Sequence, residues 1–370
     1  MTAHTNTCTI AIVGDSISQG LESSNLWTTS YVAQLRSSLQ ASYGDGGSGW
    51  VGVVNGLDKL ASIPGYPPAK TGVTVDNSAY SVLRGEGPGS YIASTLIDGA
   101  TITFVCRGST VAVYYVICTN CGNFTVTIDG VLSAMVNATG TNTIGNYNVS
   151  GLAQTNHNVT VYRIGGQPSM YMAISGVRGT NPTGVIVDNY SIVGCTASLY
   201  ITRNSVQYGE PAYWSGGPGI PSDLFIYALI VNDAAGQGLA AATADAYATT
   251  VNTHLARVSN DPASSFPNIL FIMPHIGNYQ NAAAVLYYLL LGRIYDTAKG
   301  YGAAVINLAA AFKNSWTYGF NKNLWGAATP DGTGSTGNNV VHPGDVGMAQ
   351  YASIIIPYLN LTSFQPSNGQ

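Results

Sequence analysis

The feature that most constrains the fold is a change of pattern along the chain. From about Leu57 to Val187, short β-branched and aromatic runs such as STVAVYYVI and NFTVTIDG alternate with Gly, Asn and Thr turns. Regularly spaced short strands of this kind are typical of a β-sandwich. Because no helical period interrupts them, this block is predicted to be all β.

Both flanks of the block alternate between strands and helices. An apolar strand before Gly14 leads to a helical pattern from Thr28 to Tyr43, and after the block SDLFIYALIV, NILFIMP and AAVINL predict further buried strands. Helices are expected around them, including Ala282 to Lys299 and Asp345 to Tyr358. This alternation predicts an α/β domain with a parallel sheet.

The expected organisation is an α/β domain made of residues 1–58 and 187–370, with a β-sandwich of residues 59–186 inserted into it. The first strand and helix are then separated in sequence from their partners. The segment YGDGGSGWVG, from Tyr43 to Gly52, holds five glycines and is expected to form a loop rather than a regular element.

The composition excludes several classes of protein. Only 8% of the 370 residues are charged, against roughly 25% in ordinary globular proteins. With 13 Lys and Arg against 17 Asp and Glu, the chain lacks the basic stripe that nucleic acid requires. A hydrophobic share of 46% argues against disorder. The balance favours neutral polar ligands such as sugars.

The termini and cysteines add few constraints. Met1 to Thr9 shows no signal peptide, and no apolar run approaches the ~18 residues of a membrane span. The protein is therefore expected to be soluble, with export by another route or a removed leader. Cys118 and Cys121 are expected in a hairpin as free or bridged thiols, because no second Cys/His pair completes a zinc site. No metal or cofactor is expected.

The segment AIVGDSISQG, residues 11–20, ends an apolar run on a Gly-Asp-Ser turn. In a parallel sheet such a turn exposes side chains at the carboxyl edge, where ligands bind. Ser16 is therefore a candidate nucleophile, although Asp and Ser also favour ordinary strand ends and helix caps. A serine nucleophile further needs a base and donors that hold the oxyanion.

Five histidines could supply the base. His342 stands out because it lies in a Pro/Gly loop just before the last helical pattern. His275 follows a strand end and is its competitor. His254 lies in a helical pattern with a surface-like flank, His157 in a predicted sandwich loop and His4 in the terminal tail.

Four blocks resemble the SGNH hydrolases, also called GDSL lipases and esterases, in that family's order. They are GDS with Ser16, NYSIVGCTAS with Gly194, IVNDA with Asn232 and NVVHP with His342. The resemblance covers residues 1 to about 58 and 187 to 370. It implies a flavodoxin-like, three-layer α/β/α sheet of the SGNH type around the inserted all-β sandwich.

The resemblance also implies roles for these residues. Ser16 matches the nucleophile and His342 the base, while Gly194 N–H, the Asn232 side chain and Ser16 N–H match the oxyanion hole, with Asp15 in support. Each residue also has an ordinary reading. Gly194 is a common type of turn residue and Asn232 a common strand-end cap, and His342 could simply be packed in its loop.

Two positions depart from the family pattern. Ile230 stands where a glycine is usual, which narrows the expected pocket. Asn339 stands three residues before His342, where the family has Asp, and an amide does not stabilise an imidazolium by charge. Three explanations stay open: a Ser–His dyad with amide support, an acid relocated to Asp345 or Asp331, and an introduced inactivating substitution. Asp345 resembles the N-cap of the last helix.

The expected function is a serine esterase that removes short acyl groups, O-acetyl above all, from a polysaccharide. The glycine-rich segment resembles segments of bacteriophage tail proteins, so an extracellular or virion-associated location and a homo-oligomeric or virion assembly are expected. Two alternatives stay open. One is a generic secreted short-chain esterase, and the other is a sugar-binding adhesin whose catalytic apparatus has decayed.

Overall fold

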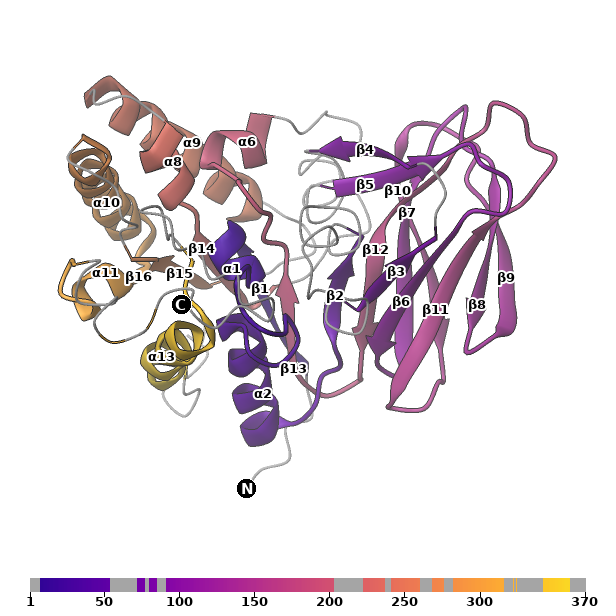
Figure 1. Ribbon diagram of the computed structural model, residues 1–370, viewed down its shortest axis with the longest axis horizontal. Coiled ribbons are helices and arrows are strands. Elements are labelled where there is room, and N and C mark those ends of the chain that lie inside the picture. Colours follow the sequence, from indigo (N-terminus) through magenta and orange to yellow (C-terminus); the bar gives the residue numbers. More distant parts are fainter. Residues whose placement is uncertain are drawn as a thin grey trace, which may run out of the picture.

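The computed structural model describes residues 7–53, 72–76, 80–84, 91–202, 222–236, 241–259, 268–275, 282–315, 322, 324 and 342–359. These residues form one parallel sheet and two antiparallel sheets (Figure 1). The chain thus has a mixed α/β fold in which a parallel sheet is joined to further antiparallel sheets.

The parallel sheet has the strand order β13-β1-β14-β15-β16. These strands span Gly184–Asn189, Thr7–Gly14, Leu224–Ala228, Asn268–Met273 and Ala304–Asn307, respectively. Every neighbouring pair is parallel, and every residue of β14 is buried, as expected for a sheet covered on both faces. The strands predicted after the all-β block are therefore confirmed. Because β13 and β14 lie on either side of β1, the strand order reverses beside β1, and ligands bind at such a point.

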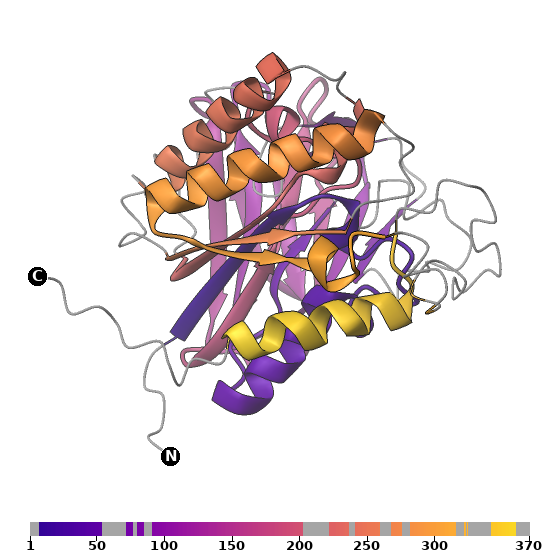
Figure 2. The ribbon, with the colours of Figure 1, turned by 90° about the vertical axis from the view of Figure 1, so that its left-hand side faces the viewer.

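Helices cover both faces of the parallel sheet (Figure 2). α2 (Tyr31–Tyr43) and α13 (Asp345–Ile355) lie side by side on one face, where the rings of Tyr31 and Tyr351 have centroids 5.8 Å apart. α9 (Ala241–Ser259) and α10 (Ala282–Tyr301) lie on the other face. The helices predicted from periodicity are confirmed, with the last one continuing as a 3-10 turn, η2 (Ile356–Leu359).

Two antiparallel sheets occupy the chain between α2 and β13. One has the order β10-β7-β12-β5-β4 with β2 also paired to β12, and the other has the order β3-β6-β11-β8-β9. Their strands are β2 (Gly49–Gly52), β3 (Val73–Val75), β4 (Ser81–Arg84), β5 (Tyr91–Thr95), β6 (Thr101–Arg107), β7 (Thr110–Ile117), β8 (Asn123–Ile128), β9 (Val131–Asn137), β10 (Thr143–Ser150), β11 (Asn156–Arg163) and β12 (Met172–Thr180).

The two antiparallel sheets pack face to face. Side chains along β8 alternate between half-buried and buried, as in a strand with one face toward a core. The rings of Tyr115 in β7 and Phe124 in β8, which belong to different sheets, meet edge to face with centroids 5.1 Å apart. The described residues of this block therefore have the all-β character that their sequence pattern predicts.

The glycine-rich segment corrects one prediction. Its last residues are not a loop but strand β2, which pairs antiparallel with Gly176 to Gly179 of β12. A Cβ on Gly176 would lie 2.7 Å from the Trp50 ring, and one on Gly179 would lie 2.4 Å from the Arg107 carbonyl oxygen. Within the segment itself Gly49 has φ +68°, and a Cβ there would lie 2.5 Å from the Val187 carbonyl oxygen. Its glycine therefore serves a left-handed backbone as well as close approach between strands.

A buried ion pair links the parallel sheet to the antiparallel sheets. Asp188 in β13 is fully buried and accepts from Arg178 Nε in β12 at 3.0 and 3.1 Å. Its Oδ1 also accepts from the backbone N–H of Trp50 at 2.7 Å. The carboxylate raises the pKa of Arg178 above its ordinary value despite burial. Loss of either partner would leave a buried charge uncompensated, which is strongly destabilising.

The domain boundaries, the paired cysteines and the absence of a membrane span were also predicted from the sequence. The predicted boundaries at 58/59 and 186/187 stay predictions, with β2 lying before the first and β13 running across the second. Cys118 and Cys121 form a disulfide, which decides between the free and bridged alternatives. Among the described residues, no helix has the length and hydropathy needed to cross a membrane.

Candidate active site

The turn that carries Ser16 follows the central strand β1 directly. Asp15 is the N-cap of the short helix α1 (Ser16–Gln19), and its Oδ1 accepts from the Ile17 N–H at 2.9 Å. A Cβ on Gly14 would lie 2.4 Å from Ser18 Oγ, so only glycine lets the turn close this tightly. The helix cap is thus Asp15, and Ser16 is left as the first helical residue at the carboxyl end of the sheet.

Ser16 and His342 meet across the fold. Ser16 Oγ lies 2.7 Å from His342 Nε2, although the two residues are 326 positions apart. Within the described part of the chain, Ser16 is the sole hydrogen-bond partner of His342. Burial lowers the pKa of the His342 imidazole to about 4. The ring is therefore neutral at physiological pH and can accept a proton from the Ser16 hydroxyl.

The other described histidines do not contact Ser16. His275 is buried, and both its backbone N–H and its Nδ1 bond to the Tyr351 hydroxyl. His254 does not have the surface-like setting expected of it, because it is fully buried against the rings of Tyr200, Phe225 and Tyr227. His157 lies in strand β11 rather than in a loop, where its Nδ1 is 2.7 Å from Asp129 Oδ2. His4 lies outside the described residues.

Gly194 and Asn232 lie together at the ends of β13 and β14. Gly194 has φ +72°, a left-handed conformation that favours glycine, and a Cβ there would meet nothing within 4 Å. Asn232, in α8 (Val231–Gly236), donates from Nδ2 to the Cys195 carbonyl oxygen at 2.9 Å. An amide nitrogen carries two donors, so this bond orients the side chain and leaves its second N–H available.

Side chains that the sequence analysis did not single out join these turns to α1. Gln19, the last residue of α1, accepts from the Val193 N–H at 2.8 Å, next to Gly194. Asn189 Nδ2 donates to the Ser18 carbonyl oxygen at 2.8 Å. Both residues lie inside or beside the quoted motif blocks, but nothing in their spacing distinguishes them. These bonds fix the Ser16 turn relative to the Gly194 turn.

Asp15 and Asp233 place two carboxyl groups beneath the site. Asp15 is fully buried and its Oδ2 has no hydrogen-bond partner among the described residues. Asp233 accepts from the Ala197 N–H, at 3.0 Å from each carboxylate oxygen, and so fixes the start of α6 (Ala197–Thr202). Burial raises the pKa of Asp15 and of Asp233 to about 7, and the Asp15 charge adds to the effect on Asp233.

We expect Asp15→Asn to remove part of the pH dependence of stability. A carboxyl group whose pKa is raised from 3.8 to about 7 on folding stabilises the fold in its protonated form, and each pKa unit is worth about 1.4 kcal/mol. The free energy of unfolding of the wild type should therefore fall as pH rises from 4 through 7.

Asn at position 15 keeps the oxygen that caps Ile17 but does not ionise. Urea unfolding at pH 5 and pH 8 should show a smaller stability loss for Asp15→Asn than for the wild type. The exposed Asp245, which pairs with Arg293, supplies the control variant Asp245→Asn. Equal pH dependence in Asp15→Asn and the wild type would contradict a protonated Asp15.

Three residues are candidates for the third catalytic member, and Asp345 is the one that the structure describes. Asp345 Oδ1 accepts from the Ser24 N–H at 2.6 Å, and it makes no bond to His342 in the described structure. Asp345 is also not the N-cap of α13, because that position is Gly344 and Asp345 is the first helical residue. Asn339 and Asp331 lie outside the described residues.

The arrangement can support acyl transfer. A hydroxyl, a neutral imidazole within hydrogen-bond distance and N–H donors at the adjacent strand ends are the groups that such a reaction needs. The Ser16 N–H belongs to the first residue of a helix, so it has no acceptor within the helix. Among the described residues the Gly194 N–H also has no acceptor.

No protein-family model and no curated protein sequence matches this chain. A solved peptidoglycan O-acetylesterase matches 97% of this chain and 92% of its own, with a TM-score of 0.66 and 19% identity. A Bacillus subtilis protein follows with a TM-score of 0.36 and 13% identity, covering 81% of this chain and 92% of its own. A family two carbohydrate esterase from Clostridium thermocellum, in complex with cellohexaose, has a TM-score of 0.29 and 11% identity, with coverage of 79% and 99%. The first of these likenesses shows that the two chains share a fold.

Proposed function

We propose that this protein is a serine esterase of the SGNH type, which removes short acyl groups, O-acetyl above all, from a polysaccharide. The observation that carries the proposal is the 2.7 Å contact between Ser16 Oγ and His342 Nε2. The strand order and the helices on both faces fit the flavodoxin-like sheet that the sequence resemblance implies.

In the proposed mechanism Ser16 Oγ attacks the carbonyl carbon of the ester while its proton passes to His342 Nε2. The tetrahedral oxyanion accepts hydrogen bonds from the N–H groups of Ser16 and Gly194 and from the Asn232 side chain. His342 then gives its proton to the departing sugar oxygen, which leaves an acyl group on Ser16. Water attacks this acyl group with His342 as the base and releases the acid and free Ser16.

Three observations support a polysaccharide substrate. The fold matches that of a peptidoglycan O-acetylesterase over 97% of this chain. The chain has few charges and a net charge of −4, and its 24 Tyr and abundant small polar residues suit neutral hydroxyl-rich ligands. Two antiparallel sheets are attached at the side of the parallel sheet, where they could hold a polymer. An extracellular or phage-tail location belongs to the same proposal.

Two assays on one protein sample test the proposal. Turnover of an aryl acetate separates an esterase from a sugar-binding protein without activity. Acetate release from O-acetylated peptidoglycan or another O-acetylated polysaccharide separates a polysaccharide acetylesterase from a generic short-chain esterase. A folded protein that turns over neither substrate would overturn the proposal, and turnover of the aryl ester alone would overturn its polysaccharide part.

We expect Asn232→Ala to lower kcat for the aryl acetate by roughly 10²- to 10³-fold, the usual effect of deleting one oxyanion donor. KM should change less, because the donor acts on charge that develops in the transition state. Asn252→Ala is the matched control, since Asn252 is exposed on α9 and its Nδ2 donates only to the Ala248 carbonyl oxygen. A raised KM with kcat intact would assign Asn232 to substrate binding instead.

A further inference from the structure

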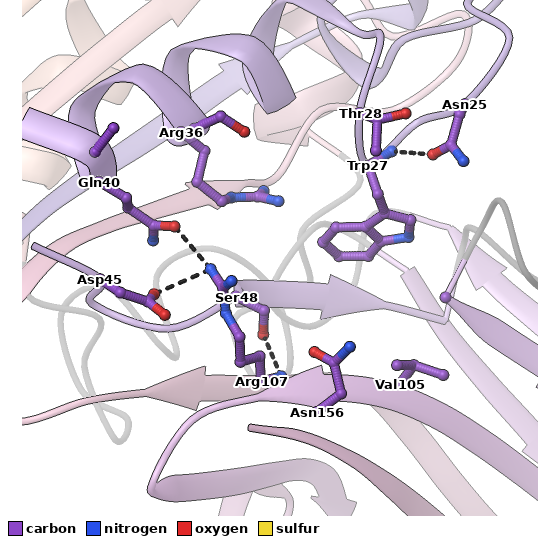
Figure 3. Close-up of a pocket in the computed structure, with 13 residues that line it drawn as sticks. Asn25, Trp27, Thr28, Arg36, Gln40, Asp45, Ser48, Val105, Arg107 and Asn156 are labelled. Atoms are coloured by element: carbon purple, nitrogen blue, oxygen red, sulfur yellow. Dashed lines mark hydrogen bonds and ion pairs between the residues drawn. The ribbon is translucent and has the colours of Figure 1, made fainter. Parts of the chain in front are cut away.

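A cavity of about 680 Å³ runs along α2, on the side that faces the antiparallel sheets (Figure 3). Arg36 lines it from α2, Trp27 from the turn before that helix, and Arg107 and Asn156 from β6 and β11. Small-molecule sites occupy about 300–1,000 Å³, so this volume holds a sugar unit. None of these residues belongs to the proposed catalytic set.

The cavity wall carries one positive charge that its carboxylates do not neutralise. Arg107 pairs with Asp45 at 3.0 Å and donates to Gln40 Oε1 at 2.7 Å. Arg36 has no ion pair with any described residue, and its hydrogen bond there runs from Nη2 to the Val187 carbonyl oxygen at 3.4 Å. Figure 3 shows its guanidinium in the space between α2 and the opposite strands.

Arg36 is only 8% exposed. The nearby carboxylate of Asp188 is already held by Arg178 at 2.9 Å. Burial is the largest effect on the pKa of Arg36, which it lowers together with the charge of Arg107, while Asp188 partly offsets them. The resulting pKa is about 10, so the guanidinium stays charged at neutral pH. A buried charge without an anionic partner is costly, and a contact with an aromatic ring offsets only part of that cost. Its position on a cavity wall therefore indicates an anion from outside the chain.

Trp27 supplies an apolar surface beside this charge. Its ring lies 5.0 Å from the Arg36 guanidinium carbon, measured to the ring centroid. The turn fixes the Trp27 backbone, because the Trp27 N–H donates to Asn25 Oδ1 at 2.8 Å and the Asn25 carbonyl oxygen accepts from the Thr29 N–H at 2.9 Å. The edge of the indole packs against Gly72, where a Cβ would lie 2.7 Å from Trp27 Nε1. An aromatic face suits the C–H groups of a sugar ring, while the exposed Asn156 can bond its hydroxyls.

The Trp27 and Arg36 pair also lies beside the candidate active site. A smaller cavity of about 30 Å³ is lined by both residues together with Gln19 and Asn189. Gln19 bonds to the turn that precedes Gly194. Trp27 and Arg36 therefore line both the larger cavity and this small space, which places the larger cavity near the turns of the candidate active site.

We propose that this cavity binds an acidic saccharide unit, with its carboxylate on Arg36 and its ring against Trp27. That the unit is part of the polysaccharide substrate rests on the proposed function. The binding itself rests on the cavity, on the Arg36 guanidinium, which pairs with no described carboxylate, and on the indole beside it. A carboxylate on a sugar ring satisfies all three, whereas a small free anion leaves Trp27 unused.

The test compares ligands of the intact protein by NMR titration. Methyl β-glucuronide and methyl β-glucoside have the same ring and differ in one carboxylate, and acetate carries the charge without the ring. We expect the glucuronide to bind roughly tenfold or more tightly than either other probe, the usual value of a hydrogen bond to a charged group. Equal binding of glucuronide and glucoside, or of glucuronide and acetate, would overturn the proposal.

Variants locate the binding. Arg36→Gln and Trp27→Ala should each weaken glucuronide binding about tenfold, whereas Arg36→Lys should retain part of it. Arg293→Gln, on the distant surface of α10 where Arg293 pairs with Asp245 and Asp296, should change nothing. Unchanged glucuronide binding in folded Arg36→Gln would also overturn the site. Should that variant not fold, the wild-type comparison of the two glycosides still decides.

Aryl acetate turnover separates this inference from the proposed function. A protein that binds the glucuronide without any esterase activity would refute the function and leave the binding site intact. An active esterase that does not distinguish the two glycosides would refute the binding site alone.

Discussion

Replacing Ser16 with alanine is expected to lower kcat for an aryl acetate by roughly 10⁴- to 10⁶-fold, the scale on which serine hydrolases respond to loss of the nucleophile. The variant lacks the oxygen that would form the acyl intermediate, so no other group of the site compensates. The fold should survive, because Asp15 and not Ser16 caps α1. Steady-state kinetics and urea unfolding of the same preparation measure both effects.

Ser353→Ala is the matched control for this change. Ser353 is exposed on α13 and its hydroxyl donates to the Gln350 carbonyl oxygen at 2.8 Å, so its loss should leave turnover unchanged. A Ser16→Ala variant that keeps more than about a tenth of the wild-type rate would show that Ser16 is not the nucleophile. A variant that loses both activity and its unfolding transition would assign Ser16 a structural role.

Periodicity predicted the parallel sheet, its helices and the all-β block because burial on one or both faces leaves a mark in the local sequence. The strand β2 was missed because its glycines serve a partner far along the chain. Gly49 and Gly52 pair with Gly179 and Gly176, and no local pattern distinguishes such glycines from those of a loop. Close backbone approach between distant segments cannot be predicted from short stretches of sequence.

The candidate site was likewise predictable only in part. Motif order singled out Ser16 and His342, and the fold brings their side chains to 2.7 Å. The bonds of Gln19 and Asn189 that align the turns were not predictable, since both depend on the register of β13 against β1. Burial was equally hidden, and it lowers the pKa of His342 and raises that of Asp15.

Replacing His342 with alanine should also lower kcat by roughly 10⁴- to 10⁶-fold, because Ser16 would lose the base that accepts its proton. Added imidazole should restore part of the rate if the missing group acts as a proton acceptor rather than as a packing element. His157→Ala is the control, since His157 lies in β11 and bonds to Asp129 and to the Ala153 carbonyl oxygen. A His342→Ala enzyme with ordinary turnover would transfer the role of base to another residue.

The pH profile of the wild type tests the same assignment without a mutation. Only the neutral imidazole accepts the Ser16 proton, and burial lowers the pKa of His342 from 6.5 to about 4. The rate kcat/KM should therefore hold down to about pH 5 and be lost as pH falls through 4. A fall centred near 6.5 would contradict the lowered pKa, either because a carboxylate offsets the burial or because solvent reaches the ring.

Such a carboxylate would have to come from outside the described residues, where Asp331 lies. Asn339 also lies there and carries an amide, but it occupies the position of the family's aspartate. Asn339→Asp then separates the remaining explanations. A carboxylate at position 339 that faces His342 should stabilise the imidazolium, raise its pKa and so move the fall in rate toward higher pH while it raises the maximal rate. An unchanged profile and rate for Asn339→Asp would show that position 339 does not orient the base, and would leave two explanations, a Ser16–His342 dyad or an acid at Asp331, which Asp331→Asn then separates.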